Sequence, residues 1–247
     1  MIAKIFRIIE ICIIEIMDYR FAYLAGDGLL AIVWMILFFL RRDLRKQQLF
    51  TSFLLMPFAP FADYMWFYRD YWRPEYIFPM HIGHVTLGLE SPLFAFLVGG
   101  IAAVCYEAVF RKHHVFGRPR LELIIPLIVV AITLMTIFTV FFGMYSIWAS
   151  ILVILSLSLA MMCIDKDIRQ DAFWSCILMT VLVFFVYVIW LVFYPNVIDK
   201  FWIPRILTGI TIMNIPLEEI LWFAAVGIGG GILYEFLFNA NRYPKKR

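Results

Sequence analysis

Stretches of about twenty apolar residues recur along the whole chain, with short polar segments between them. A helix of that length is long enough to cross the hydrocarbon core of a bilayer. The residue-by-residue alternation typical of a membrane β-barrel is not seen in the sequence. The pattern therefore predicts an all-α membrane protein with about seven transmembrane helices, at approximately 22–40, 50–68, 85–110, 121–143, 146–164, 173–194 and 210–238.

The first twenty residues, MIAKIFRIIEICIIEIMDYR, follow a different pattern. At about 100° per residue, Lys4, Arg7, Glu15 and Asp18 fall on one side of a helix, and apolar residues occupy the rest. We expect an amphipathic helix lying on the membrane surface over residues 1–20, with an eighth short span as the alternative. The segment has no small-residue site of the kind at which a signal peptide is cleaved.

Composition and charge refine this picture. The chain has 247 residues, of which 64% are hydrophobic and 16% charged, and this is too apolar for a soluble domain of that length. Most basic residues follow alternate spans, which places them on one side of the membrane. The positive-inside rule makes that side cytoplasmic in a cell membrane, with the C-terminus inside and the N-terminus outside. The residues concerned are Arg41, Arg42, Arg45, Lys46, Arg111, Lys112, Arg118, Arg120, Lys166, Arg169, Arg242, Lys245, Lys246 and Arg247.

The second half of the chain repeats the first. Residues 89–107 align without gaps on residues 217–235 at an offset of 128, and residues 41–50 match 165–174 at an offset of 124. One linker span separates the two copies of three spans each. The first and fifth spans therefore run in the same direction, and both copies cross the membrane in the same sense. Two parallel repeats usually enclose a central cavity, although a cavity that holds only lipid is an alternative. The organisation we expect is an interfacial helix at 1–20, a first three-helix repeat at 21–112, a linker helix at 113–144, a second repeat at 145–240 and a basic tail at 241–247.

Carboxylates stand near the outer ends of several spans. Pro216 suits the first turn of a helix, and Glu218 and Glu219 follow it directly. Glu90 repeats Glu218 in the first copy, and Asp27 and Asp63 lie on the same side of the membrane. Charges at this depth are costly unless they face a cavity or become protonated. The alternative is that both glutamates cap the helix near the interface, ionised and wet. Glu107 and Glu235 also repeat, but we expect them to reach water at cytoplasmic helix ends in a structural role.

Aromatic residues gather on the same outer side, and they make up 18% of the chain. Many of them fit an interfacial belt. Others are placed to line the cavity, where an aromatic face would stabilise a cation. A carboxylic acid beside aromatic faces in an apolar pocket suits the protonation of an alkene. The aromatic residues that we expect in the cavity are Trp66, Trp190, Trp222, Phe223 and Phe94.

The octapeptide PLEEILWF at 216–223 resembles the Pro-x-Glu-Glu-x-x-Phe-Phe motif of the membrane-integral lycopene cyclases. These domains are fused to phytoene synthase in fungi and split into two small subunits in some bacteria. The resemblance covers about residues 21–238 and includes the duplication and the span count. The first copy departs from the motif, because Gly88-Leu89-Glu90-Ser91 lacks the proline and the second glutamate.

The resemblance implies acid-catalysed ring closure at the end of a linear isoprenoid polyene such as lycopene, without net redox change. It implies Glu218 as the acid, with Glu90 and Glu219 as proton partners or base. Asp63 and Asp27 would bind the substrate, together with the five aromatic residues named above. No cofactor, metal or nucleic acid is expected. Beyond the lipid bilayer, a second copy of the chain or another enzyme of carotenoid synthesis is an open choice of partner.

Three other readings remain at this stage. A small-solute transporter with the same three-one-three parallel repeats is the main alternative, as in the sugar-transporting SWEET proteins, although their Pro-Gln motif is not found in this sequence. A retinal-binding receptor needs a lysine at mid-depth of the last span, and none of the seven lysines qualifies. A non-catalytic membrane scaffold is the third alternative.

Overall fold

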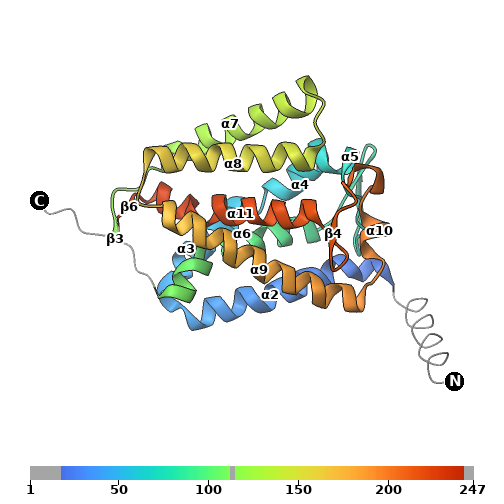
Figure 1. Ribbon diagram of the computed structural model, residues 1–247, viewed down its shortest axis with the longest axis horizontal. Coiled ribbons are helices and arrows are strands. Elements are labelled where there is room, and N and C mark those ends of the chain that lie inside the picture. Colours follow the sequence, from blue (N-terminus) through green and yellow to red (C-terminus); the bar gives the residue numbers. More distant parts are fainter. Residues whose placement is uncertain (1–17, 112–114, 242–247) are drawn as a thin grey trace, which may run out of the picture.

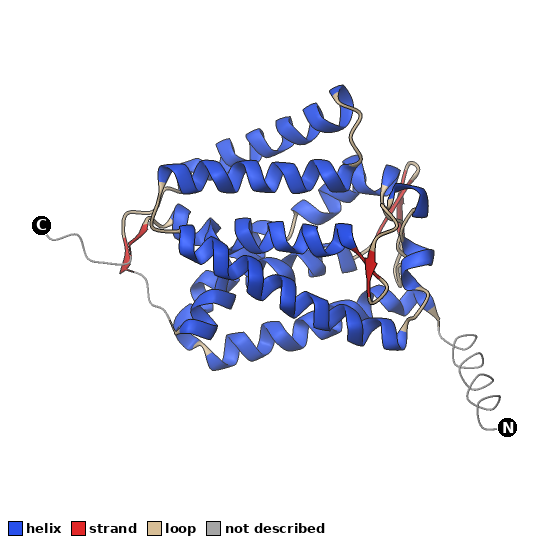
Figure 2. Ribbon diagram, viewed as in Figure 1, coloured by secondary structure: helices blue, strands red, loops and turns tan. Residues whose placement is uncertain are grey.

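The computed structural model describes residues 18–111 and 115–241, and these residues form a bundle of long apolar helices (Figures 1 and 2). Within them, six helices are long and apolar enough to cross a membrane, which confirms the predicted all-α, multi-pass membrane fold. The interfacial helix predicted for 1–20 falls outside the described residues except for its last three. The long helices are α2 (Ala22–Leu40), α6 (Glu90–Phe110), α7 (Ile124–Thr136), α8 (Ser146–Ile164), α9 (Arg169–Phe193) and α11 (Leu217–Leu237).

Short helical turns extend these helices or join them. Three precede or follow long helices directly: η1 (Tyr19–Phe21) before α2, η4 (Leu121–Leu123) before α7, and the π-turn η5 (Ile137–Phe141) after α7. The remaining pieces lie in connections and comprise η2 (Arg42–Leu44), α10 (Val197–Phe201) and η6 (Pro204–Ile206).

The stretch predicted as one span at 50–68 is broken. It consists of α3 (Arg45–Leu55), α4 (Phe58–Ala62), the π-turn η3 (Asp63–Phe67) and α5 (Tyr68–Asp70). Pro57 stands at the break between the first two pieces and Pro60 lies inside the second. A proline has no N–H to donate and its ring clashes with the preceding turn, so a continuous helix cannot form here. The break allows Asp63 to begin its own turn.

Three two-stranded ribbons were not expected from the sequence. The hairpins β1–β2 (Met80–Ile82 and Val85–Leu87) and β4–β5 (Thr211–Ile212 and Ile215–Pro216) lead directly into α6 and α11. Their turns fall at Gly83 and at Met213-Asn214, all with positive φ, as tight hairpin turns require. The third ribbon pairs β3 (Val115–Phe116) with β6 (Ala240–Asn241) at the opposite end of the bundle.

Helices α6 and α11 form the centre, and each packs against one neighbour through a glycine. Gly99 of α6 lies against Thr51 and Leu55 of α3, while Gly227 of α11 lies against Ser175 and Met179 of α9. These residues correspond at the predicted offsets of 124 and 128. A Cβ added to Gly227 would come within 2.6 Å of the Ser175 carbonyl oxygen, so only glycine permits this approach. The matched contacts support the proposed repeat.

The two halves also meet at their outer connections. Trp72 and Trp202 form an isolated antiparallel bridge. The Arg73 N–H donates to the Phe201 carbonyl, and the Ile203 N–H donates to the Tyr71 carbonyl. This reciprocal pairing is what an approximate two-fold axis between the two tryptophans would produce. Trp72 and Trp202 are offset by 130, as are the turns of the two hairpins. Compared with the offset of 124 earlier in the repeat, the second copy has six extra residues before Trp202. The offset is 128 within α11, so the second copy has two residues fewer between its hairpin turn and that helix.

Glu107 and Glu235 do not reach water, contrary to the expectation from their position at helix ends. They are 1% and 0% exposed. Glu235 accepts a hydrogen bond from the Gln47 amide, which also donates to the Ala103 carbonyl at 2.5 Å. Gln47 therefore ties α3 to both α6 and α11 at this end of the bundle.

We expect Gly227→Ala to lower the free energy of unfolding by about 1–3 kcal/mol, because the new methyl group forces α11 away from α9. Gly28→Ala is the matched control, since nothing lies within 4 Å of its added Cβ. That change should stabilise α2 by about 0.5–1 kcal/mol, because alanine loses less backbone entropy than glycine. Thermal unfolding of the purified variants in detergent measures both. Equal shifts would show that the α9–α11 contact is not tight.

Candidate active site

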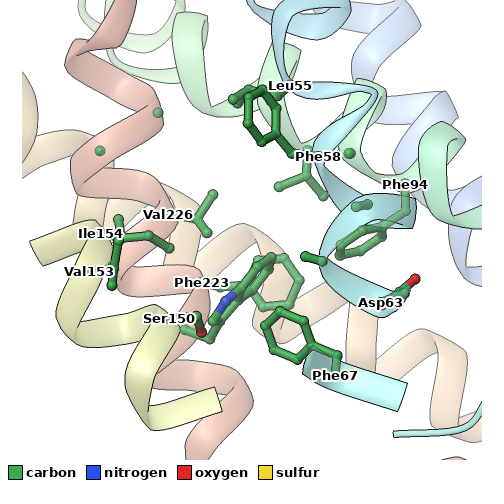
Figure 3. Close-up of a pocket in the computed structure, with 18 of the residues that line it drawn as sticks. Leu55, Phe58, Asp63, Phe67, Phe94, Ser150, Val153, Ile154, Phe223 and Val226 are labelled. Carbon is green, nitrogen blue, oxygen red and sulfur yellow. The ribbon is translucent and has the colours of Figure 1, made fainter. Parts of the chain in front are cut away.

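A cavity of about 430 Å³ lies beside α11, enclosed by residues of both halves and of the linker helix α7 (Figure 3). Its wall is apolar over most of its surface. In the close-up, Phe58 and Phe67 face Val226 and Phe223 across the open space. All five aromatic residues named from the sequence line it, namely Trp66, Trp190, Trp222, Phe223 and Phe94. Three carboxyl groups reach it, those of Asp27, Asp63 and Glu219.

Glu219 is the most extensively hydrogen-bonded of the three. Its Oε1 accepts from the Tyr71 hydroxyl at 2.5 Å and from the Trp202 indole N–H at 2.9 Å. Its Oε2 accepts from the Tyr187 hydroxyl at 2.5 Å. The residue is buried, and it stands in the first turn of α11, where the helix dipole favours negative charge. Three donors and a helix start together stabilise the ionised form of this carboxyl group.

Asp63 is held by two donors from its own half of the chain. The Trp72 indole N–H donates to one carboxyl oxygen at 3.0 Å, and the Ser91 hydroxyl donates to the other at 2.6 Å. Ser91 also contacts the Tyr76 hydroxyl at 3.2 Å. Asp63 is 5% exposed, so these bonds replace the water that its carboxyl group has lost.

The repeat relates the surroundings of Asp63 to those of Glu219, but the carboxyl and hydroxyl groups have exchanged positions. Ser91 corresponds to Glu219 at the offset of 128, and Asp63 corresponds to Tyr187 at the offset of 124. In the second half the carboxyl group stands on the helix start and the hydroxyl on the preceding span, whereas the first half has the reverse. Each pair is completed by an indole N–H, from Trp72 or Trp202. The ring centroids of these two tryptophans lie 5.6 Å apart.

Glu90 and Glu218 occupy matched positions and make matched contacts. Glu90 accepts from the backbone N–H of Ile77 at 2.9 Å, and Glu218 accepts from that of Thr208 at 2.5 Å. Both are buried, at 4% and 0% exposed, and neither is among the described residues that line the cavity. Each side chain therefore fastens the connection that precedes its own helix. The role of acid inferred for Glu218 stays a prediction, and the geometry gives Glu219 the position facing the cavity.

Asp27 differs from every other cavity carboxyl group. It comes from α2, is 1% exposed, and has no hydrogen-bond partner for either carboxyl oxygen among the described residues. Trp190 lies beside the same helix, because its indole N–H donates to the Ala22 carbonyl at 2.7 Å. Phe94 stacks on Trp222 with ring centroids 6.1 Å apart and completes this side of the wall.

Ser91, which donates to Asp63, was missed from the sequence as a site residue, and so were four aromatic residues that hold the carboxyl groups. These are Tyr71, Trp72, Tyr187 and Trp202. All four belong to aromatic-rich segments near the outer ends of spans, where most aromatic residues serve as an interfacial belt. The repeat offsets do pair Tyr187 with Asp63, and that pairing was the available signal.

The fold and cavity thus define a multi-pass membrane protein with a buried aromatic chamber that holds acidic groups. The family model described as lycopene cyclase matches residues 144–237, which contain α8, α9 and α11. This match confirms the resemblance over those residues. No curated protein and no solved structure matched the chain. The family points to an enzyme of carotenoid cyclisation that acts on an isoprenoid held in the membrane.

We expect Tyr187→Phe to cost about 1.5–3 kcal/mol of stability, because it removes a hydrogen bond to a buried charged group. Tyr19→Phe is the matched control: Tyr19 is also buried, but its hydroxyl has no partner among the described residues. Its loss should be neutral or mildly stabilising. Unfolding of both proteins in the same detergent provides the comparison. A harmless Tyr187→Phe would mean that this hydroxyl does not hold Glu219.

Proposed function

We propose that the protein closes a ring at the end of a linear isoprenoid polyene such as lycopene, as an intramolecular lyase or isomerase. One observation carries this proposal. A cavity inside the membrane-spanning bundle brings carboxyl groups from both halves of the chain against a wall of aromatic rings. The family match over the second half supports the same substrate class.

The reaction needs a proton donor, a stabilised cation and a proton acceptor. A carboxylic acid protonates the terminal alkene and leaves a tertiary cation. The neighbouring double bond attacks that cation, which forms the ring C–C bond and moves the positive charge onto the ring. A ring C–H bond then breaks, its electrons restore a double bond, and the proton passes to a carboxylate. Nothing is oxidised or reduced.

Glu219 is the acceptor that fits this scheme best. Its three donors already stabilise negative charge on its oxygens, which suits a group that takes up a proton. Trp202, which donates to Glu219, also presents its ring to the cavity beside Trp72. Indole faces stabilise a nearby cation. The positive charge would therefore develop on the cavity side of the two tryptophans, near the Glu219 carboxyl group.

The shape of the cavity favours a long apolar substrate. Its lining extends along α11 from Glu219 to Leu237, a distance of about 27 Å at the rise of an α-helix. This approaches the thickness of a bilayer core, about 30 Å. The end group would lie at Glu219 and the polyene tail along α11, so that one end of the substrate enters at a time.

Helix α7 leaves this groove open toward lipid. It packs along α8 but makes no comparable contact with α3 or α4 in the described residues, although all of them line the cavity. Little of the α7 surface is buried. A lateral entrance suits a substrate dissolved in the bilayer, and a transporter would instead need an aqueous path along the membrane normal. We propose that the carboxyl end of the cavity faces the outer side of the cell membrane and that the basic end, with the C-terminus, faces the cytoplasm.

The test of function is pigment chromatography in a bacterial host that accumulates lycopene. Wild type should yield cyclic carotenes. Glu219→Gln should lower their formation at least about 100-fold, because an amide cannot accept the ring proton. The matched variant Glu218→Gln should keep most of the activity, because its carboxyl group serves only the Thr208 N–H. Active Glu219→Gln with inactive Glu218→Gln would return the catalytic role to Glu218. Unchanged lycopene in a well-expressed wild type would reject this substrate.

A second experiment tests the groove. Ala131 of α7 lines the cavity, whereas its neighbour Val130 is 44% exposed on the outer face of the same helix. Ala131→Trp should reduce lycopene cyclisation at least tenfold by filling the path of the tail. Val130→Trp adds the same side chain to the lipid side and should change little. Product per unit of inserted protein is the measure. Equal effects in both variants would place the tail elsewhere.

A further inference from the structure

We propose that Asp27 is the proton donor of this reaction, and this inference rests on the proposed cyclisation. The scheme above needs a carboxylic acid that is already protonated when the alkene arrives. Three carboxyl groups line the cavity, and their surroundings divide them into two kinds. Environments that favour opposite protonation states on neighbouring carboxyl groups are the usual basis for assigning an acid and a base.

The surroundings of Asp27 favour the neutral form. Neither carboxyl oxygen accepts a hydrogen bond from a described residue, and the side chain is 1% exposed. On the same helix, Tyr23, Gly26 and Leu30 line the cavity with it. An ionised carboxylate without donors in such apolar surroundings would cost several kcal/mol, so the group keeps its proton. Asp27 also lies beyond the first turn of α2, outside the reach of favourable helix-end charge.

The other two cavity carboxyl groups have hydrogen-bond donors in place of their lost hydration. Glu219 accepts three hydrogen bonds and Asp63 accepts two. Of the three groups, Asp27 is therefore the one suited to give a proton away. Glu219, with the most donors, is the one suited to receive the ring proton.

The charged and titratable groups around Asp27 agree with this division. Glu90 interacts with it electrostatically, and Tyr23 interacts with both Asp27 and Asp63. No lysine or arginine among the described residues acts on Asp27. A second carboxyl group nearby, with no compensating cation, further favours a neutral Asp27.

Tyr23 supplies what Asp27 needs after it has reacted. The two residues stand four apart on α2, so their side chains lie on the same face of the helix. The Tyr23 hydroxyl is buried and lies near Ser91. It is placed to donate to the carboxylate that remains once Asp27 has protonated the alkene. Transfer of the captured proton from Glu219 back to Asp27 then completes the cycle, with no net gain or loss of protons.

The first measurement is independent of activity. Infrared difference spectra of the purified protein at neutral pH report the C=O stretch of a protonated carboxyl group, which a carboxylate lacks. We expect Asp27→Asn to lose one such band that Glu219→Gln and the surface control Asp18→Asn retain. If the spectrum of Asp27→Asn equals that of wild type in this region, Asp27 is ionised and cannot be the donor.

The second measurement follows the proton itself. Lycopene is supplied to wild type and variants in D2O, and deuterium is measured in recovered substrate and in product. Asp27→Asn should form no cyclic product and transfer no deuterium, and Asp27→Glu should restore part of both. Glu219→Gln should still deuterate the recovered linear polyene, because protonation precedes the step that it blocks.

The outcomes separate the two proposals. An inert wild type rejects the cyclase function, whereas the infrared band still reports on Asp27. An active wild type with an active Asp27→Asn variant overturns the donor assignment alone. Deuterium transfer by Asp27→Asn but not by Glu219→Gln would reverse the two roles.

Discussion

The interior of a bilayer contains no water to satisfy polar groups, and the structure follows from that constraint. The carboxyl groups of Asp63 and Glu219 each take the place of lost hydration with hydroxyl and indole donors from the bundle. Glu235 meets the same constraint by accepting a hydrogen bond from the buried Gln47 amide. The short strands lie at the two ends of the bundle (Figure 2), where backbone groups that leave a helix can find partners or water. Against this background, a carboxyl group without a donor stands out.

The two halves of the chain share a plan but divide the chemistry between them. The glycine contacts and the glutamates that hold the preceding connections recur in both copies at the offsets found in the sequence, and the hairpins recur at an offset of 130. At the cavity the same three group types recur, carboxyl, hydroxyl and indole, but the carboxyl and hydroxyl have exchanged elements. A symmetric chamber would offer two equivalent carboxyl groups. A reaction that gives a proton at one carbon and takes it from another instead needs groups of unlike character, and Asp27, without a donor among the described residues, differs in this way from Glu219.

Much of the fold could be predicted from apolar length and spacing, because span length reflects the thickness of the bilayer. The all-α membrane architecture is confirmed, and five of the predicted spans coincide closely with long helices. The hydropathy of residues 50–68 predicts one span, whereas Pro57 and Pro60 within that stretch break it into shorter pieces. The hairpins escaped notice because strands of two or three residues carry too little alternation to detect.

The site was predicted in kind but not in detail, for a physical reason. Glu218 and Glu219 are adjacent on one helix, so their side chains point about 100° apart, and no pattern in the sequence says which one faces inward. The repeat appeared to favour Glu218, because it matches Glu90. Residues that match between the copies, such as Glu90 and Glu218, instead hold the scaffold that both copies need. The group that faces the cavity, Glu219, stands where the first copy has Ser91.

The loose attachment of α7 has a consequence for how such a protein meets its substrate. Where the cavity opens between helices, acyl chains of the bilayer complete its wall, and lipid becomes part of the site. A polyene reaches this entrance by diffusing within the plane of the membrane. Encounter then depends on the number of substrate molecules per unit area of that membrane, and on the thickness and fluidity of its lipids. The volume concentration of substrate in the cell plays no direct part.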